Sequence, residues 1–322
     1  MKSAIQGFAR RLDRFQQRHA ALGFPIAVWK KFTDDQAGNL AALLAFFGFV
    51  SLFPTLLILA TVLGVVLRHD PGLQQRVLNS ALADFPVIGE QLKTNIHSIG
   101  RGGAGFVIGA VGMLLGARGM ANAAQNALNR VWEVPYVRRP GFPFNWLRSY
   151  GMIMVIGTGV LVTVTLSGIG TWAGHAGLGF GVRAGTLALS LVLNVGLFWL
   201  GLRLATAREI PGRDLRTGAA LAALIWQILQ TLGGYVVAHQ LRHASSLYGV
   251  FGLVLGLIAW LYLQAQLTLF AAEIDVVRVR RLWPRSLFPP PLTPEDQEAY
   301  RSYRQVEQRR PAEEIDGGSP GE

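Results

Sequence analysis

The chain has 322 residues and a formal net charge of +11, and 51% of its residues are hydrophobic while only 15% are charged. This apolar content, with a mean hydropathy of +0.34, exceeds that of ordinary soluble domains and excludes a water-soluble core as the expected architecture. The absence of cysteine excludes disulfides, thiolate metal sites and cysteine nucleophiles.

The N-terminal segment, residues 1–32, predicts an amphipathic helix with a basic face. Its arginines fall mainly off the apolar positions, which recur at three- and four-residue steps: Ile5, Phe8, Leu12, Phe15, His19 and Leu22. Such a helix either lies in the cytoplasmic membrane interface or packs on the protein's own cytoplasmic loops. The four residues at the end of the segment predict an aromatic and basic anchor at headgroup depth: Trp29, Lys30, Lys31 and Phe32.

Long stretches without charge follow this segment. The first, residues 37–67, runs for 31 residues, which is more than the roughly 20 residues that cross a bilayer as a helix. Five more charge-free stretches come after it, at 102–117, 149–182, 184–202, 217–241 and 243–272. We therefore predict an all-α, polytopic integral membrane protein with six transmembrane helices in residues 33–280 and with amphipathic interfacial helices.

The first two spans carry residues that affect helix packing. A straight helix over the first stretch would reach about 46 Å against a hydrocarbon core of about 30 Å, and Pro54 near its middle predicts a kink. The external loop between the spans, residues 68–101, predicts an amphipathic helix on the outer surface. Glycines on one face of the second span predict a close helix approach: Gly105, Gly109, Gly112, Gly116 and Gly119.

The C-terminal tail, residues 281–322, is predicted to be cytoplasmic and partly disordered. Thr293 as N-cap and Pro294 as the first helical residue, followed by two acidic residues, predict a short helix that runs to about Arg310. From Gly317 onwards we expect disorder.

The positive charges alternate between the two sides of the membrane. When the Lys and Arg are assigned loop by loop, 24 of the 30 fall on the side that holds both termini. This bias predicts that the N- and C-termini are cytoplasmic. The basic charge is therefore explained mainly by topology, with an added role in binding anionic headgroups as the alternative. Membrane lipids are the expected partners, and nucleic acid is not.

Polar residues inside the predicted spans are the candidate functional residues, because such groups are costly in lipid. Glu273 and Asp275 end the sixth span, where Arg278 and two further arginines could neutralise them as ordinary ion pairs; the alternative is an ion or substrate gate. The amides either bond across helices or line a shared polar route. The candidate intramembrane polar or gating residues are Asn39, Pro54, Asn194, Gln227, Gln230, Tyr248, Gln264, Glu273 and Asp275.

No catalytic, cofactor-binding or metal-binding residues are expected. The six histidines form no dense cluster with carboxylates in the sequence, and His239 and His243, which share a helical face, have no carboxylate nearby. No phosphate-binding glycine loop of the Walker type occurs. We therefore expect that the protein is not an enzyme and needs no cofactor.

Three segments resemble a known family. They are AALLAFFGFVSLFP at 41–54, preceded by Asp35, then ALNRVWEVP at 127–135, and YGVFGLVLGLIAWLYLQAQLTLFAAEIDVV at 248–277. Together they resemble the YihY/BrkB family of bacterial inner-membrane proteins over about residues 30–280. The resemblance implies a six-span plasma-membrane protein of unassigned biochemistry, from a family labelled both virulence-associated and ribonuclease. It supplies no accepted catalytic residues to transfer.

The function expected from these features is to move or accommodate a lipid-like or small solute between helices. The polar residues within the spans and the kinked first span motivate this hypothesis. The main alternative is a non-catalytic envelope scaffold or virulence-associated resistance factor, and a ribonuclease is a distant third.

Overall fold

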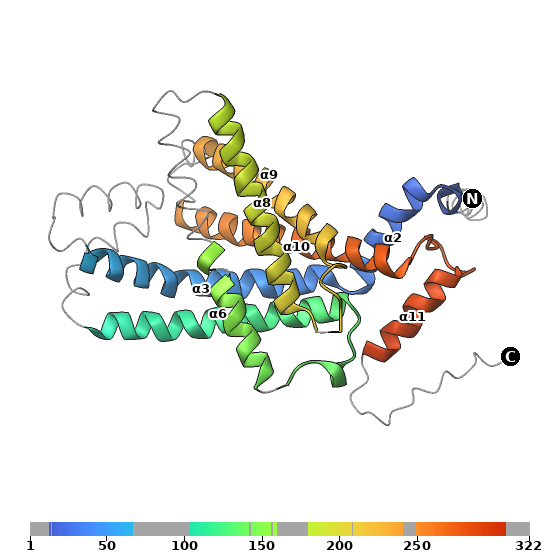
Figure 1. The fold of residues 1–322 in the computed structure, drawn as a ribbon, viewed down its shortest axis with the longest axis horizontal. Coiled ribbons are helices and arrows are strands. Elements are labelled where there is room, and N and C mark those ends of the chain that lie inside the picture. The colour runs from blue at the N-terminus through green and yellow to red at the C-terminus, as the bar shows by residue number, and fades with distance from the viewer. Residues whose placement is uncertain are drawn as a thin grey trace. The chain divides into compact units, whose positions relative to one another are not determined.

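The computed structural model describes residues 13, 15–66, 103–141, 143–155, 157–159, 180–207, 209–240 and 249–306. Within these residues every regular element is helical and no strand occurs (Figure 1). The all-α prediction is therefore confirmed for the part of the chain that the structure describes.

The elements follow the charge-free stretches of the sequence. They are α2 (Ala20–Asp34), α3 (Ala37–Val66), α6 (Gly103–Val131), the short 3-10 helix η2 (Tyr136–Arg138), α8 (Phe180–Ala205), α9 (Arg216–Gln240), α10 (Gly249–Arg280) and α11 (Pro294–Val306). Residues 144–155 are also helical. Each of the six charge-free stretches overlaps at least one of these helices.

Fewer than six of these helices meet the length and hydropathy expected of a membrane span. Among the described residues, Leu187–Ala205 and Val254–Arg280 are long and apolar enough. Ala21–Asp34 and Ala37–Leu52 become a third if they are counted as one bent span. Six transmembrane helices therefore remain a prediction.

The chain divides into two compact units. The first comprises Met1–Ala42, Ala121–Ala238 and Leu263–Glu322, and the second comprises Leu43–Met120 and His239–Tyr262. The residues discussed below as a candidate site all belong to the first unit.

In the second unit, α6 approaches α3 closely at two of the predicted glycines. A Cβ atom added to Gly116 would lie 3.1 Å from both Cα and Cβ of Ser51, and one added to Gly119 would lie 2.5 Å from the ring of Phe47. A Cβ atom at position 119 would force the Phe47 ring to move, and one at position 116 would press on the backbone of α3, so the close approach favours glycine at both positions. The predicted close approach is confirmed at these two residues.

Helices α2 and α3 are separated by a turn at Asp35 and Gln36. Gln36 has a positive φ of 54°, and the backbone N–H of Asp35 donates to the Lys31 carbonyl. The flanking helical segments are bent by 63°. Helix α3 then continues past position 54, so the predicted kink at Pro54, whose side chain lies outside the description, stays a prediction.

At the N-terminus the first part of the predicted amphipathic helix, residues 1–12 and 14, lies outside the described residues. Residues 15–18 are helical, His19 is not, and α2 begins at Ala20. Of the predicted headgroup anchor, Trp29 is exposed, whereas Lys31 is fully buried. The anchor prediction is therefore wrong for Lys31, because that side chain turns inward to carboxylates of distant segments.

The predicted start of the C-terminal helix is confirmed. Helix α11 begins at Pro294, and the Thr293 hydroxyl accepts a hydrogen bond from the Asp296 backbone N–H at 3.1 Å. The Thr293 N–H in turn donates to the Asp296 carboxylate at 3.3 Å, which completes a reciprocal cap. The element ends at Val306, and the predicted continuation to Arg310 and the predicted disorder from Gly317 lie outside the described residues.

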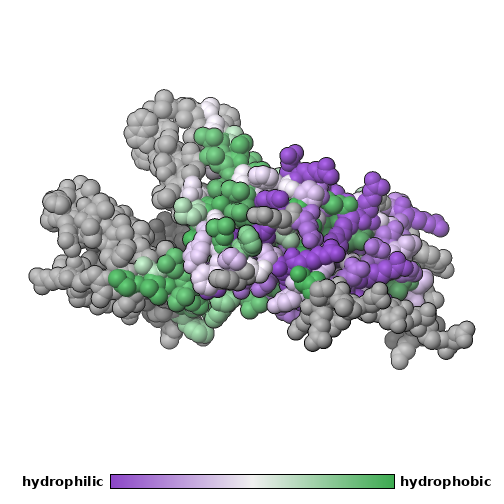
Figure 2. All heavy atoms as spheres, turned by 60° about the horizontal axis from the view of Figure 1, so that its bottom comes forward, coloured by the Kyte–Doolittle hydropathy of each residue, from purple (hydrophilic) through white to green (hydrophobic). Residues whose placement is uncertain are grey.

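Large apolar side chains are exposed along several helices of the first unit. Val192 on α8 is 67% exposed, and Leu147 and Met154 on residues 144–155 are each 70% exposed. Figure 2 shows hydrophobic and hydrophilic residues gathered in separate areas of the visible face. Extended exposed apolar helix faces are typical of contact with lipid and untypical of a soluble monomer.

Candidate functional site

A buried group of charges surrounds the amino group of Lys31. Its Nζ atom lies 2.5 Å from Asp35 Oδ2, 3.2 Å from Glu133 Oε1 and 3.3 Å from Glu273 Oε2. Arg280 contacts the second carboxyl oxygen of Glu133, Oε2. We call these residues the Lys31 cluster: Lys31, Asp35, Glu133, Glu273 and Arg280.

Three segments bring the Lys31 cluster together. Lys31 and Asp35 are four residues apart at the end of α2, so they lie on one helix face. Glu273 and Arg280 are seven residues apart on α10, which also places them on one face. The third segment is the turn after α6, which carries Glu133.

Charge burial in the Lys31 cluster is nearly complete. The side chains of Lys31, Glu133 and Glu273 are 0% exposed, and the Lys31 amino group also donates to the Val131 carbonyl at 2.9 Å. Buried charges persist only when they are paired, because desolvation of each ion costs several kcal/mol. Such a group is therefore a functional candidate, particularly at the end of an apolar helix.

Glu133 occupies a backbone conformation that disfavours ordinary side chains. Its φ is 54°, and the Val134 N–H donates to the Asn129 carbonyl at 2.8 Å, which forms a Schellman turn after α6. Glycine usually occupies this position, and another residue costs roughly 1–2 kcal/mol. The ion pairs with Lys31 and Arg280 offset that cost. Strain retained at a buried carboxylate indicates that the carboxylate itself is needed.

Arg281 offers a matched test of this interpretation. It also has a φ of 54° and ends α10 in the same type of turn, but its side chain is exposed. We expect Arg281→Gly to raise the unfolding free energy by about 1 kcal/mol. Glu133→Gly should lower it by about 3 kcal/mol, because Lys31 and Arg280 lose a partner. Thermal unfolding in detergent checks both variants; a gain in stability for Glu133→Gly would contradict the proposed role of its carboxylate.

A second buried polar group joins the C-terminal segment to α2. Arg285 is 0% exposed, and its guanidinium lies 2.9 Å from both Asp34 and Asp296. Lys30 donates to Asp296 at 2.8 Å. We call the set the Arg285 network: Asp13, Gln16, Lys30, Asp34, Arg285, Ser286 and Asp296.

Backbone and hydroxyl groups complete the Arg285 network. The Ser286 N–H donates to Asp296 at 2.9 Å, and the Ser286 hydroxyl and the Leu287 N–H each donate to Asp13 at 2.9 Å. Helix α11 contributes to both charge groups. Its Asp296 belongs to the Arg285 network, and the ring of its Tyr303 lies 5.8 Å from Lys31 Nζ. Residues 282–306 are therefore held against α2.

The network shifts the pKa of Asp296. Burial alone would raise that pKa, but hydrogen bonds from Lys30, the Ser286 N–H and Arg285 outweigh burial and lower it to about 2. The pKa of Asp13 is also lowered: burial opposes the shift, and hydrogen bonds from the Leu287 N–H, Gln16 and Ser286 cause it.

The lowered pKa predicts acid sensitivity. Because the folded-state pKa of Asp296 lies below its ordinary value of 3.8, the ionised carboxylate stabilises the fold fully above about pH 4. That contribution is lost as the pH falls through about 2. We expect the melting temperature of the wild type to exceed that of Asp296→Asn near neutral pH and the two to converge in acid. A difference that does not change with pH would contradict this assignment.

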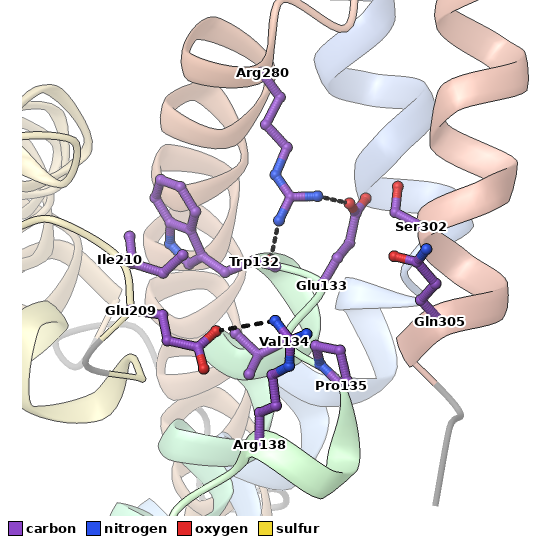
Figure 3. A pocket seen from close by; sticks show the side chains of 10 residues that line it. All are labelled: Trp132, Glu133, Val134, Pro135, Arg138, Glu209, Ile210, Arg280, Ser302 and Gln305. Atoms are coloured by element: carbon purple, nitrogen blue, oxygen red, sulfur yellow. Dashed lines mark hydrogen bonds and ion pairs between the residues drawn. The ribbon is translucent and has the colours of Figure 1, made fainter. Parts of the chain in front are cut away.

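A polar pocket of about 280 Å³ opens beside the Lys31 cluster (Figure 3). Arg280 and Glu133 belong to both, and Ser302 and Gln305 reach the pocket from α11. The full lining is Trp132, Glu133, Val134, Pro135, Arg138, Glu209, Ile210, Arg280, Ser302 and Gln305. Arg280 is fixed by its hydrogen bonds to Glu133 and to the Trp132 carbonyl.

A second pocket of about 250 Å³ shares two of these residues, Arg138 and Glu209. It is more apolar, and its lining is Arg138, Pro140, Phe144, Leu147, Arg148, Ala207 and Glu209. Arg138 and Glu209 form an exposed ion pair at 3.7 Å between the two pockets. Such a pair contributes little stability, so both side chains remain able to bind a ligand. We call these two sites the polar pocket and the apolar pocket.

The loop after α8 positions Glu209 and Ile210. Arg203 donates to the Ile210 carbonyl at 2.8 Å, and the Ala207 N–H donates to the side chain of Asn129 on α6 at 2.9 Å. The first bond holds the loop to α8, and the second ties it to the end of α6, which precedes the turn that carries Glu133.

The residues predicted from the sequence are only partly brought together. Glu273 lies in the Lys31 cluster, where it pairs with Lys31 at 3.3 Å rather than with one of the arginines that follow it. Asp275 is paired as predicted with Arg278 at 3.2 Å, and it also accepts the Gly218 N–H at 2.8 Å. The neutralisation prediction is thus confirmed for Asp275 and corrected for Glu273.

The predicted amides do not meet in either pocket. Asn39 and Gln230 are exposed, Asn194 is buried, and Gln227 and Gln264 are half-buried. None of these amides lines the polar pocket or the apolar pocket. The side chain of Pro54 and all of Tyr248 lie outside the description.

The sequence interpretation missed several residues of the site. Lys31 was assigned to the membrane interface, and Asp35, Glu133 and Asp296 were given no functional role. The four-residue spacing of Lys31 and Asp35 was the available signal for one pair. Among the described residues, no group of three or more His, Asp or Glu is arranged to hold a metal ion.

Comparisons with known proteins identify relatives over most of the chain. The family model described as "Virulence factor BrkB" matches residues 28–290. The inner membrane protein YhjD of Escherichia coli is 30% identical over 278 residues, which cover 80% of this chain and 81% of that protein. A UPF0761 membrane protein of Pseudomonas paraeruginosa is 26% identical over 280 residues, covering 81% of this chain and 64% of that protein.

A further relative carries a different label. The ribonuclease-like protein YfkH of Bacillus subtilis is 24% identical over 283 residues, covering 81% of this chain and 96% of that protein. No solved structure matches the chain. The resemblance noted in the sequence is thereby confirmed.

Proposed function

The chain belongs to the virulence factor BrkB family of membrane proteins, and we propose that it accommodates or moves a lipid-like or small solute. In this proposal six helices cross the bacterial inner membrane and both termini are cytoplasmic. The distribution of Lys and Arg, 24 of 30 on the side of the termini, supports that orientation.

The adjoining polar and apolar pockets carry the proposal. An amphiphile needs a polar site for its headgroup directly beside an apolar site for its chain, and the two pockets meet at Arg138 and Glu209. Exposed Leu147 and Phe144 line the apolar pocket on a helix with further exposed apolar residues. This arrangement suits a molecule that remains partly in the lipid phase.

The charges of the pockets favour an anionic headgroup. Arg138 lines both pockets, Arg148 lines the apolar pocket, and Arg280 lines the polar pocket. Arginine binds phosphate and carboxylate oxygens with paired hydrogen bonds. Because the polar pocket is small for a complete lipid, it fits a headgroup or a small polar solute.

Lipid retention tests the proposal. We expect mass spectrometry of wild-type protein purified in mild detergent to show one lipid or solute class enriched over bulk lipid. Arg138→Ala should reduce that enrichment about tenfold, which corresponds to the loss of one charge-assisted hydrogen bond. Arg301→Ala is the matched control, because Arg301 on α11 is 70% exposed and lines neither pocket. Equal retention by all three proteins, or bulk lipid alone, would favour a scaffold.

Catalysis is not part of this proposal. The name of the relative YfkH includes a ribonuclease label, and metal-dependent nucleases rely on clustered ligands that hold catalytic ions. Release of acid-soluble nucleotides from RNA by the purified wild type, abolished by a point substitution in this chain, would replace the solute proposal with a nuclease.

A further inference from the structure

We infer that the Lys31 cluster is a binding site for one proton, held on the carboxyl group of Glu273 and shared with Asp35. The inference concerns a ligand other than the proposed solute and does not depend on the solute. It follows from the balance of charge in the cluster and from the hydrogen bonds that Glu273 lacks.

The charges that face Glu273 do not balance. Helix α2 contributes Lys31 and Asp35, the turn after α6 contributes Glu133, and α10 contributes Arg280 and Glu273 itself. Helix α11 contributes the Tyr303 ring, which carries no charge near neutral pH. Among the described residues, two cations therefore face three carboxyl groups in this buried site. One bound proton makes the site neutral, which removes the cost of an uncompensated buried charge.

Glu273 is the carboxyl group with the weakest partners. Asp35 lies 2.5 Å from Lys31 Nζ, whereas Glu273 lies 3.3 Å from it. Glu133 has a second cation, Arg280. Both carboxyl oxygens of Glu273 are buried and accept no hydrogen bond from the part of the chain that the structure describes. Buried polar atoms without partners are rare in folded proteins, so of the three carboxyl groups Glu273 is the one that gains most from being protonated.

A proton supplies what Glu273 lacks. When protonated, a carboxyl group gains an O–H donor, and the carboxyl groups of Asp35 and Glu273 lie against the same Lys31 Nζ atom, at 2.5 and 3.3 Å. Two neighbouring carboxyl groups often share one proton, because two negative charges close together in a buried site would repel each other. A metal ion in the same place would have to displace the Lys31 amino group, which already lies among the three carboxyl groups.

The proton site adjoins the polar pocket. Glu133 contacts Lys31 in the cluster and lines the pocket, and Arg280 does the same from α10. Loss of the proton from Glu273 would add a negative charge next to these two side chains. The occupancy of the proton site is therefore positioned to alter the binding of a charged ligand in the pocket.

Infrared spectroscopy tests the inference on the purified full-length protein in an ester-free detergent. At about pH 8, ordinary carboxyl groups, with a pKa of about 4, are ionised, so a C=O band of a carboxylic acid reports a carboxyl group that is held protonated. We expect such a band, shifted in deuterated water, in the wild type. Glu273→Gln should remove it, and Asp275→Asn should retain it, because Asp275 already has Gly218 N–H and Arg278 as partners.

Each alternative result overturns the inference. No band in the wild type, or an unchanged band in Glu273→Gln, would show that Glu273 is ionised. Loss of the band in Asp35→Asn, with the band retained in Glu273→Gln, would place the proton on Asp35 alone. Glutamine has the shape and neutrality of protonated glutamic acid, so we also expect Glu273→Gln to elute as wild type and to melt within a few degrees of it. Failure of that variant to fold would equally contradict a neutral Glu273.

Discussion

Replacing Lys31 with methionine should be among the most damaging single substitutions in this protein. Methionine matches the length of lysine but leaves Asp35, Glu133 and Glu273 without their shared cation. Removing one partner of a buried ion pair typically costs 3–5 kcal/mol. We expect the melting temperature in detergent to fall by about 10 °C or more, or the protein to be lost from the monodisperse fraction.

The neighbouring residue provides the control for this prediction. Lys30 lies on the same helix, but its side chain is 15% exposed, and its partner Asp296 keeps a bond to Arg285. Lys30→Met should therefore lower the melting temperature much less than Lys31→Met. Adding Asp35→Asn to Lys31→Met should recover part of the loss, because the carboxylate nearest to Lys31 Nζ is removed from the uncompensated site. Equal effects of the two lysine substitutions would show that Lys31 is not the centre of the cluster.

Arg285→Leu is expected to release the C-terminal segment. Arg285 is 0% exposed and lies 2.9 Å from both Asp34 and Asp296, so leucine leaves two carboxylates with fewer partners in the same space. We expect a loss of about 3–5 kcal/mol and rapid proteolysis within residues 282–306.

The surface arginine of the same segment separates this effect from a general loss of charge. Arg301→Leu removes an exposed side chain whose ion pair with Glu298 spans 3.8 Å, and such pairs contribute at most about 1 kcal/mol. Proteolysis of Arg301→Leu should therefore follow the wild type. If Arg285→Leu also remained resistant, the network would not be what holds α11 in place.

Much of the fold could be predicted because it depends on local sequence. The absence of charge over residues 37–67 and the N-cap at Thr293 each specify a helix without reference to distant segments. Glycine spacing likewise predicted the close approach seen at Gly116 and Gly119. Membrane crossing by six helices remains a prediction, because part of the chain lies outside the described residues.

The site could be predicted only in part, because its contacts join distant segments. Lys30 and Asp296 are bonded although they are 266 residues apart, and no periodicity specifies such a pair. Glu273 and Asp275 were selected because carboxylates are costly at the end of an apolar span. Lys31 was misassigned because a lysine beside Trp29 is typical of a membrane interface, and only the folded chain turns it inward.

The polar and apolar pockets depend on turns whose conformation the sequence does not specify. Glu133 adopts a positive φ that glycine would ordinarily supply, so the Schellman turn after α6 has no sequence signal. That turn determines where Glu133 and Arg138 lie, and both line the polar pocket. The candidate site therefore emerged from backbone geometry rather than from a motif.

Photocrosslinking with an anionic phospholipid analogue tests the central claim most directly. The probe carries its reactive group near the headgroup and is added to full-length protein in lipid bilayers, and labelled peptides are mapped by mass spectrometry. We predict that labelling concentrates on residues 138–148 and 207–210, and that Arg138→Ala reduces it there. Labelling spread evenly over exposed apolar helices such as Leu187–Ala205, and unchanged in Arg138→Ala, would contradict a binding site at the two pockets.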